Sequence, residues 1–372
     1  MIVGIPREIK NHEYRIGLTP DCVGELTRSG HDVIVEHDGG TAIGFDNDQY
    51  LAAGAEIVDS PEVVFKRADM VVKVKEPQPQ ECRMLREGQI LFTYLHLAPD
   101  PEQARLLLES GATCIAYETV TGPAGGLPLL APMSEVAGRM AIQAGCHSLE
   151  KAQGGSGVLL GGVPGVEPAR VLVIGGGVVG VNAARMAAGL GADVTVVDKS
   201  IDRLKELDAL YGNQMKTLFS TRDAIDRHAL EADLIVGAVL IPGAAAPKLL
   251  SREQVSKLKP GTVLVDVAID QGGCFETSRP TTHEEPCYIV DGVVHYCVAN
   301  MPGGVARTAT LALTNATLPY VLKLASEGAR GAVLADRHLM NGLNVHAGKM
   351  THEAAADALG YEFIRPQQAL AA

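Results

Sequence analysis

The sequence predicts an α/β protein with two lobes, each built on a mostly parallel sheet. Three observations lead to this prediction: short apolar runs alternate with segments of helical pattern, hydrophobic residues make up 47% of the chain, and 41 of its 372 residues are glycine. Alternating strands and helices favour parallel pairing, because a parallel strand is reached through a crossover that is usually a helix. A chain of this length can form two domains, each with its own core.

The first lobe is predicted from the N-terminal third of the chain. Its expected strands are five apolar runs: Ile2–Ile5, Val33–Val35, Met70–Val74, Ile90–Leu95 and Cys114–Val120. The segments Asp21–Ser29 and Asp100–Ser110 have a helical pattern, and each begins with an aspartate that can cap a helix. A long helix is expected to follow, with Ser134 as its N-cap and its end near Ala152.

The most informative stretch is a glycine-rich turn between a buried strand at 171–174 and a helix of small residues at 178–190. Three glycines fit the pattern G-x-G-x-x-G: Gly175, Gly177 and Gly180. The first allows a tight turn, the second lets the backbone approach a pyrophosphate, and the third lets helix and strand pack closely. A second strand ends at Asp198, where an acid that binds ribose is expected. This order predicts a Rossmann-type doubly wound sheet that binds a dinucleotide.

Asp198 also bears on which dinucleotide is bound. A carboxylate about 4 Å from a 2′-phosphate costs roughly 4 kcal/mol at an effective dielectric of about 20. NAD is therefore favoured over NADP. Lys199 and Arg203 follow closely and could attract a phosphate. They could equally form a solvated edge, and Arg203 could lie against the adenosine half of the cofactor.

Further strand and helix patterns follow Asp198. Buried strands are predicted at three places: Ala232–Leu240, Thr262–Asp270 and His295–Ala299. A helix is expected from Thr308 to Ser326, with Pro319 as a kink or restart. The remaining tail, to Ala372, is expected to be helical and to pack on the first lobe.

Two domains follow from these elements. Residues 1–130 with 307–372 would form a substrate domain, and residues 131–306 would form the dinucleotide-binding domain. We expect two helices to cross between the lobes and the active site to lie in the cleft between them.

Composition excludes several function classes. The net charge of −12 argues against nucleic acid or an anionic membrane as a partner. The seven cysteines are odd in number and show no C-x-x-C spacing, which favours small buried side chains in a reducing compartment. The N-terminus enters a strand pattern at once, without the basic and apolar regions of a signal peptide. We expect a cytoplasmic protein with no bound metal.

Polar residues at the carboxyl ends of predicted strands are the candidates for chemistry, because ligands of open α/β sheets bind there. Lys73 and Lys75 lie two residues apart and therefore share one strand face, although either could belong to a solvated edge. His96 follows another strand, and a lone histidine at such a place is more often structural.

Two further candidates come from opposite ends of the chain. Arg15 lies in a polar loop and by itself is an ordinary surface arginine. Asp270 ends the last strong apolar run and could be a turn or cap residue, whereas Asp266 is better explained as purely structural. Together the candidates include an arginine that can clamp a carboxylate, a lysine that can polarise a carbonyl, and a histidine that can shuttle protons.

Several blocks of the sequence resemble the alanine dehydrogenase family. They cover nearly the whole chain: 6–20, 73–77, 129–138, 161–166, 267–276, 278–282 and 296–303. The resemblance implies that Arg15 and Lys75 bind the carboxylate and carbonyl of pyruvate or alanine, and that His96 and Asp270 are the catalytic pair. Beside the three fingerprint glycines it implies these cofactor contacts: Ser134, Val178, Val179, Asp198, Arg203, Ser220, Val239, Leu240, Val267, Ala268, Ile269, Asp270, Arg279, Val298, Asn300 and Met301.

The implied reaction is the reversible, NAD-dependent conversion of L-alanine to pyruvate and ammonium. His96 would act as general acid and base, and Asp270 would stabilise the amine and the attacking water. Members of the family are commonly homohexamers, and the same assembly is expected here. Three alternatives remain: the NAD-binding subunit of a proton-translocating transhydrogenase, a saccharopine- or opine-forming dehydrogenase with a larger substrate, and a non-catalytic NAD-binding scaffold.

Overall fold

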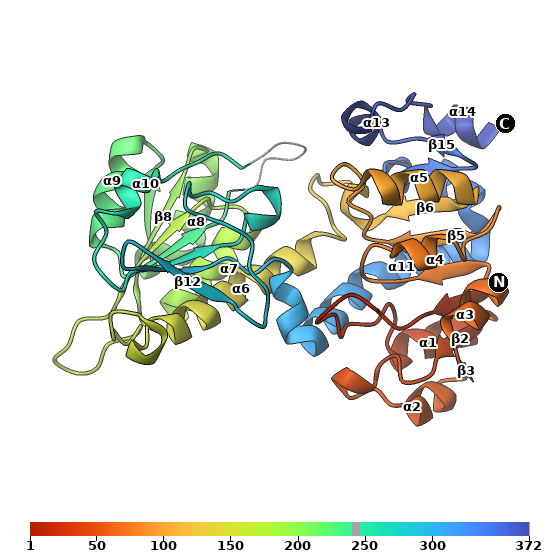
Figure 1. The fold of residues 1–372 in the computed structure, drawn as a ribbon, viewed down its shortest axis with the longest axis horizontal. Helices are drawn as coiled ribbons and strands as arrows, with labels where there is room; N and C mark the ends of the chain where they lie inside the picture. Colours follow the sequence, from red (N-terminus) through yellow and green to blue (C-terminus); the bar gives the residue numbers. More distant parts are fainter. Residues whose placement is uncertain (240–245, 372) are drawn as a thin grey trace. The chain divides into compact units, whose positions relative to one another are not determined.

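The computed structural model describes residues 1–239 and 246–371, which form two compact units. Unit 1 comprises Met1–Met133 and Val305–Ala372, and unit 2 comprises Ser134–Gly304. Each unit contains one sheet of mostly parallel strands together with helices, which confirms the predicted α/β class (Figure 1).

Unit 1 is built on an eight-stranded sheet with the order β15-β14-β6-β5-β4-β1-β2-β3. Its strands are β1 (Ile2–Ile5), β2 (Asp32–Glu36), β3 (Glu56–Val58), β4 (Met70–Val72), β5 (Ile90–Thr93), β6 (Thr113–Ala116), β14 (Leu343–His346) and β15 (Lys349–Met350). The first six strands pair in parallel, whereas β14 runs antiparallel to β6 and β15. Its helices are α1 (Pro20–Arg28), α2 (Asn47–Ala52), α3 (Pro61–Arg67), α4 (Pro79–Cys82), α5 (Pro101–Ser110), α11 (Ala306–Ala335), α12 (Arg337–Met340), α13 (Glu353–Leu359) and α14 (Pro366–Ala371).

The tail of the chain is only partly helical, so the prediction of a helical tail was wrong. The strands β14 and β15 extend the sheet beyond β6. Leu343 and Val345 are fully buried, and they alternate with Asn344 and His346 in the period of a strand. The alanine-rich helices on either side hid this short pattern.

Two other local predictions in unit 1 were also wrong. Thr19, and not Asp21, caps α1, because its hydroxyl accepts a hydrogen bond from the Cys22 N–H at 3.4 Å. The helix α11 continues through Pro319 and departs from helical geometry at Gly328, where φ is 70°. Glycine adopts that conformation at little steric cost, which explains the position of the break.

A buried ion cluster joins the ends of β1 and β4 in unit 1. Lys73 is fully buried, and its ammonium lies 3.1 Å from Glu8 Oε2 and 2.7 Å from Glu81 Oε1. Burial alone would lower the pKa of Lys73, but the two carboxylates raise it, so the lysine stays charged. Glu8 also accepts the Val74 N–H at 2.6 Å. Lys73 is therefore a structural residue and not a surface cation at the strand edge.

Unit 2 is built on a seven-stranded sheet with the order β12-β13-β11-β10-β7-β8-β9. Its strands are β7 (Arg170–Ile174), β8 (Asp193–Asp198), β9 (Lys216–Phe219), β10 (Leu234–Gly237), β11 (Val263–Asp266), β12 (Cys287–Val290) and β13 (Val293–Tyr296). Its helices are α6 (Ala131–Ser148), α7 (Val178–Gly189), α8 (Ile201–Tyr211), α9 (Arg222–Glu231) and α10 (Arg252–Val255). Apart from β12, whose partner β13 is antiparallel, the strands pair in parallel.

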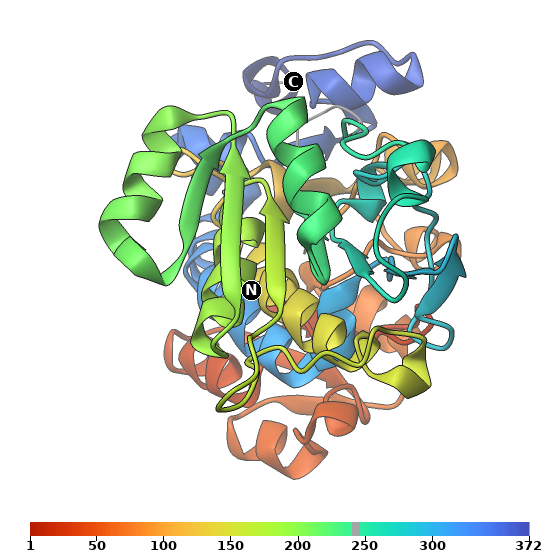
Figure 2. The ribbon, with the colours of Figure 1, turned by 90° about the vertical axis from the view of Figure 1, so that its left-hand side faces the viewer.

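The parallel part of this sheet has the strand order of a dinucleotide-binding fold. Numbered from β7, the order β9-β8-β7-β10-β11-β13 reads 3-2-1-4-5-6, and the order reverses at β7. Figure 2 shows β7, β8 and β9 side by side. The predicted Rossmann-type sheet is confirmed. Its ligand side is the carboxyl end of β7, where the glycine-rich turn begins.

Two element boundaries that bear on predicted site residues of unit 2 differ from the predictions. The helix α6 begins at Ala131, so Ser134 lies within its first turn and is not an N-cap. The strand predicted to run to Asp270 ends at Asp266, and Asp270 lies in a short 3₁₀ turn, Ile269–Gln271. Apolar residues continue beyond the paired strand in this region, which made the predicted strand too long.

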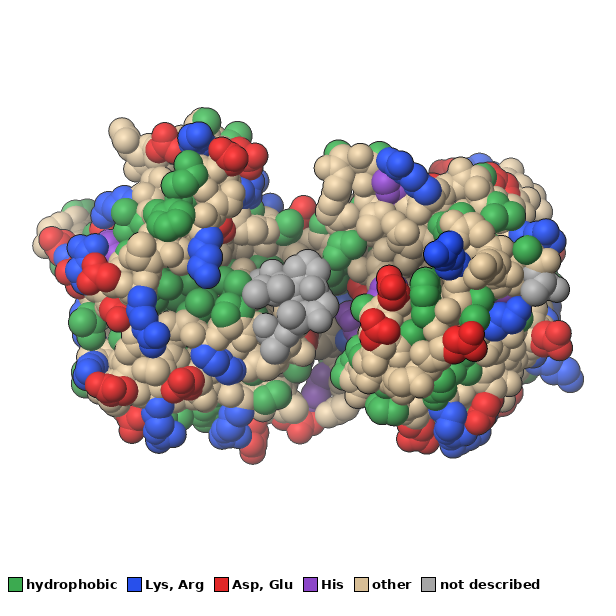
Figure 3. All heavy atoms as spheres, turned by 90° about the horizontal axis from the view of Figure 1, so that it is seen from above, with side chains coloured by type: hydrophobic (Ala, Val, Ile, Leu, Met, Phe, Trp, Pro, Cys, Tyr) green, Lys and Arg blue, Asp and Glu red, His purple; other side chains and the backbone are tan. Residues whose placement is uncertain are grey.

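Charged side chains of both signs are interspersed on the visible face of each unit (Figure 3). The net negative charge of the chain therefore does not collect into one acidic surface on that face. Among the described residues, no helix is both long and apolar enough to cross a membrane.

We predict that Lys73→Met destabilises the protein by about 3–5 kcal/mol, because it leaves two carboxylates buried without their shared cation. Urea unfolding measures the free energy of unfolding. The exposed Lys66 of α3 offers a matched control, since Lys66→Met should change that free energy by less than about 0.5 kcal/mol. Equal effects of the two substitutions would show that the buried cluster adds nothing to stability.

Candidate active site

The carboxyl ends of four adjacent strands of unit 1 carry a cluster of charged residues. The sheet order places β6, β5, β4 and β1 side by side. The loops that follow these strands contain Glu118, His96, Lys75 and Arg15, respectively. Ligands of α/β sheets bind at this edge. Arg15, Lys75 and His96 were predicted from the sequence, whereas the carboxylates beside them were not.

Arg15 is held rigidly although it lies in a loop. It is almost fully buried; its Nε lies 2.7 Å from Glu13 Oε1 and its Nη2 lies 2.5 Å from Glu13 Oε2. Its Nη1 contacts the sulfur of Met133 at 3.1 Å. Burial alone would lower the pKa of Arg15, but Glu13 raises it. This paired geometry fixes the plane of the guanidinium, as bidentate recognition of a carboxylate requires.

Glu76 connects Lys75 with His96. Its Oε1 lies 3.1 Å from Lys75 Nζ and 3.8 Å from His96 Nε2, while its Oε2 accepts from Lys10 Nζ at 2.9 Å. Burial alone would raise the pKa of Glu76, but Lys75, His96 and Lys10 together lower it to about 2. Glu76 is therefore ionised at neutral pH and keeps the lysine beside the histidine.

His96 is presented to solvent by an unusual backbone conformation. Its φ is 47°, and its N–H donates to Glu118 Oε1 at 2.6 Å. The imidazole stacks on the ring of Tyr94, with the ring centroids 5.7 Å apart and the planes within 3° of parallel. Its Nδ1 lies 3.8 Å from Glu118 Oε1, which is too far for a hydrogen bond. The ring is thus oriented by stacking and by its backbone, and 43% of the side chain is exposed.

The glycine-rich turn of unit 2 fits a dinucleotide. Gly175 has a φ of 103°, and a Cβ on Gly180 would lie 1.7 Å from the carbonyl oxygen of Gly175. At Gly177 a Cβ would have no atom within 4 Å, so the backbone there faces open space. Within the described part of the chain, no side chain forms a cap hydrogen bond at the N-terminus of α7. Its free N–H groups can therefore receive a pyrophosphate, as the fingerprint requires.

Asp198 is fixed beside this turn. Its Oδ2 accepts the Gly176 N–H and its Oδ1 accepts the Ser200 N–H, both at 2.7 Å. Arg203 donates from Nε to the Gly176 carbonyl oxygen at 2.6 Å, and the Ser220 N–H donates to the Asp198 carbonyl oxygen at 2.9 Å. The structure thus brings three predicted cofactor residues, Asp198, Arg203 and Ser220, to the end of β8.

The other predicted cofactor residues differ in exposure. Four are buried: Ala268, Ile269, Val298 and Met301. More accessible are Ser134, Val178, Val179, Val239, Val267, Asp270, Arg279 and Asn300. The guanidinium of Arg279 lies 4.1 Å above the ring of Tyr288. Leu240 lies outside the described residues.

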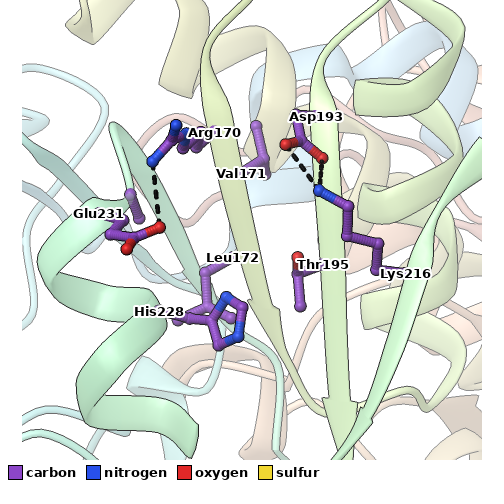
Figure 4. Close-up of a pocket in the computed structure, with 9 residues that line it drawn as sticks. Arg170, Val171, Leu172, Asp193, Thr195, Lys216, His228 and Glu231 are labelled. Atoms are coloured by element: carbon purple, nitrogen blue, oxygen red, sulfur yellow. Dashed lines mark hydrogen bonds and ion pairs between the residues drawn. The ribbon is translucent and has the colours of Figure 1, made fainter.

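A polar groove of about 180 Å³ lies at the opposite edge of the unit 2 sheet (Figure 4). It is lined by the amino-terminal ends of β7, β8 and β9 and by α9. Two ion pairs cross it, Arg170–Glu231 at 3.0 Å and Lys216–Asp193 at 2.6 Å. Because ligands of this fold bind at the carboxyl ends of strands, the groove is not the cofactor site.

Comparisons with known proteins agree with this geometry. Family models described as the N-terminal and C-terminal domains of "Alanine dehydrogenase/PNT" match residues 4–137 and 141–353. The chain is 63% identical to an alanine dehydrogenase of Halomonas elongata, over 98% of both chains. It is 55% identical to an alanine dehydrogenase of Bacillus subtilis, over 100% of this chain and 98% of the other.

Two solved structures share the fold of the whole chain. An L-alanine dehydrogenase matches with a TM-score of 0.94 and 50% identity, over 97% of this chain and 99% of the other. A transhydrogenase from Sinorhizobium meliloti matches with a TM-score of 0.81 and 25% identity, over 95% of this chain and 100% of the other.

We predict that the stability supplied by Glu76 depends on pH. Its pKa falls from 4.5 to about 2 on folding, so its contribution is fully present above about pH 4.5 and is lost as the pH falls toward 2. The stability difference between the wild type and Glu76→Gln, up to about 3 kcal/mol, should therefore shrink with acid. Urea unfolding from about pH 6 to about pH 3 measures it. The control is Glu87→Gln, at an exposed glutamate. The prediction would be contradicted if the stability difference between the wild type and Glu76→Gln stayed constant over this pH range.

Proposed function

The chain belongs to the alanine dehydrogenase family, and we propose that it catalyses the reversible, NAD-dependent oxidative deamination of L-alanine to pyruvate and ammonium. The observation that carries this proposal is the cluster of Arg15, Lys75 and His96 at one edge of the unit 1 sheet. A substrate with a carboxylate and a carbonyl group would need residues of these types. The structural likeness to a transhydrogenase supports the alternative of an NAD-binding subunit. The higher identity to alanine dehydrogenases and the charged cluster favour the enzyme.

In this proposal unit 1 binds the substrate. Arg15 binds the carboxylate through guanidinium donors that Glu13 holds in one plane. Lys75 donates to the carbonyl oxygen of pyruvate and stabilises the charge that develops there as the carbon is attacked. The pairing of Lys75 with ionised Glu76 keeps its ammonium beside His96.

Unit 2 binds NAD in this proposal, with the pyrophosphate on the first turn of α7 and the ribose hydroxyls on Asp198. The α-ammonium of alanine must first lose a proton to solvent. Bound NAD would then supply the acceptor for the hydride of the α-carbon, which leaves an iminium on that carbon. His96 takes a proton from the water that adds to the iminium, and returns a proton to the nitrogen as the carbinolamine collapses. Asp270 stabilises the substrate ammonium and orients the water. Ammonium and pyruvate are released.

We also propose that the enzyme acts in the cytoplasm as a homohexamer, as is common among proteins that this sequence resembles. The partners in this proposal are small molecules, and the net charge of −12 gives no general attraction to nucleic acid or anionic membranes. Light scattering on the purified protein tests the assembly.

The oxidation of NADH by pyruvate, measured with and without ammonium, tests the proposed function. Turnover is expected only when both pyruvate and ammonium are present. Turnover with pyruvate and an amino acid in place of ammonium would indicate an opine-forming enzyme. Binding of NADH without turnover in any mixture would indicate a transhydrogenase subunit or a scaffold. His96→Ala, which should lose at least about 10²-fold in kcat, controls for contaminating activity.

Asp198 is predicted to make the enzyme prefer NAD to NADP, because its carboxylate repels a 2′-phosphate. Asp198→Gly should lower the ratio of kcat/KM with NAD to kcat/KM with NADP by at least about tenfold. Turnover with NAD should weaken and turnover with NADP should improve. Steady-state kinetics with both cofactors measure the ratio. Comparable kcat/KM values in the wild type would remove this role from Asp198.

Arg15→Ala and Lys75→Ala are predicted to lower kcat/KM for pyruvate by at least about 10²-fold, because each removes a charge that binds the anionic substrate. NADH affinity, followed by fluorescence titration, should change little. If either folded variant lost NADH binding as severely as turnover, that residue would not act on the substrate carboxylate or carbonyl.

A further inference from the structure

The segment between β11 and Ser278 carries Asp270, and we call Val267–Ser278 the Asp270 loop. After its 3₁₀ turn the chain passes through Gly272 and Gly273, whose φ values are 88° and 77°. Backbone hydrogen bonds within the loop include Gly273 N–H to the Ala268 carbonyl oxygen at 3.0 Å. Asp270 itself is exposed. Side chains outside the loop also contribute to its conformation, as the following contacts show.

Asp266 holds the loop from inside the unit. This carboxylate is fully buried, and its Oδ1 accepts the Ala268 N–H at 3.2 Å. Its Oδ2 accepts the Cys274 N–H at 2.7 Å and the hydroxyl of Ser278 at 2.5 Å. Asp266 thus ties together the parts of the loop that precede and follow Asp270.

Gly273 makes this buried contact possible. A Cβ at this position would lie 2.7 Å from Asp266 Oδ2 and 2.8 Å from the Cβ of Ser278. Its positive φ would also strain any larger residue. The turn at Gly273 is therefore shaped around the carboxylate of Asp266.

Lys248 holds the same loop from its exposed side. Its ammonium donates to the carbonyl oxygens of Gly272, of Gly273 at 2.8 Å and of Phe275 at 3.3 Å. Among the described residues, no carboxylate forms an ion pair with it. Hydrogen bonds from an ionised donor are stronger than neutral ones. Lys248 therefore ties the two-glycine turn, which begins two residues after Asp270, to the segment before α10.

The backbone around Lys248 runs along the loop as well. Ala246 N–H donates to the Gln271 carbonyl oxygen at 2.9 Å, and Leu249 N–H donates to the Cys274 carbonyl oxygen at 2.7 Å. Between these two contacts, the side chain of Lys248 supplies donors to the Gly272 and Gly273 carbonyl oxygens.

We propose that Lys248 and Asp266 are positioning residues that fix Asp270 by holding its loop from opposite sides. The proposal rests on the proposed function, since it assumes that Asp270 serves the chemistry. Misplacing a reacting group by about 1 Å can cost roughly 10²-fold in rate, so loosening the loop should lower turnover even though neither residue is a catalytic one.

The test uses Lys248→Met, which keeps the length of the side chain but removes its donors, and Lys248→Arg, which keeps charge and donors. We expect Lys248→Met to lower kcat by at least about tenfold and Lys248→Arg to restore a large part of it. NADH affinity should change less than about threefold. The matched control is Lys257→Met, which removes an exposed lysine of the same unit that pairs with Glu253 at 2.6 Å; it should leave turnover unchanged.

A double-mutant cycle identifies the route of the effect. In an Asp270→Asn background, Lys248→Met should lower kcat by less than about twofold, because the group that it positions is already disabled. Equal losses in both backgrounds, or near-normal turnover by Lys248→Met, would overturn the proposal. A loss of NADH affinity as large as the loss of kcat would place Lys248 at the cofactor instead. Near-normal turnover by Asp270→Asn would also overturn it.

Hydrogen exchange separates this proposal from the proposed function, because it needs no turnover. Peptides that cover residues 267–278 should exchange faster in Lys248→Met and in Ser278→Ala, which removes one donor to Asp266, than in the wild type or in Lys257→Met. Unchanged exchange in both variants would refute the positioning role even if the wild type converts alanine. Faster exchange in a chain that does not oxidise alanine would place the failure in the proposed function.

Discussion

The site in unit 1 depends on ion pairs between carboxylates and cations at the ends of strands. Glu8 and Glu81 hold Lys73, Glu13 holds Arg15, and Glu76 holds Lys75. Each of these contacts offsets the cost of removing a charge from water. Lys73, the innermost cation, stays charged because two carboxylates lie so close to it. A site for an anionic substrate is thereby built within a chain whose net charge is −12.

Unit 2 offers backbone groups, and not charged side chains, to its predicted ligand. Its predicted ligand is also an anion, but the donors there are N–H groups at the start of α7, which none of the described side chains caps. The close approach of the backbone at Gly180 to the backbone at Gly175 sets the direction of these N–H groups. Two carboxylates of this unit, Asp198 and Asp266, accept backbone N–H groups and order loops. Among the described residues, neither of these two forms an ion pair with a cation.

Features encoded by short spacing could be predicted from the sequence. The glycine turn, the strand order around it and the acid at the end of β8 follow from local geometry that few other residues tolerate. Partners distant in the chain could not be predicted. Glu118 meets the N–H of His96 across 22 residues, and β14 pairs with β6 from the far end of the chain. Nothing in the local pattern of either segment encodes such a pairing.

The position of Asp270 shows how a long apolar run can mislead the prediction of a strand end. The apolar run before it suggested a residue at the end of a strand, yet the strand ends at Asp266 and the loop beyond is ordered by side chains. Ordering the loop costs free energy when the protein folds. Because the loop is already ordered, Asp270 needs little reorganisation when a substrate binds. The same reasoning applies to Glu13, which holds Arg15. In both units, therefore, buried or bridging partners orient the residues to which we assign a role in the chemistry.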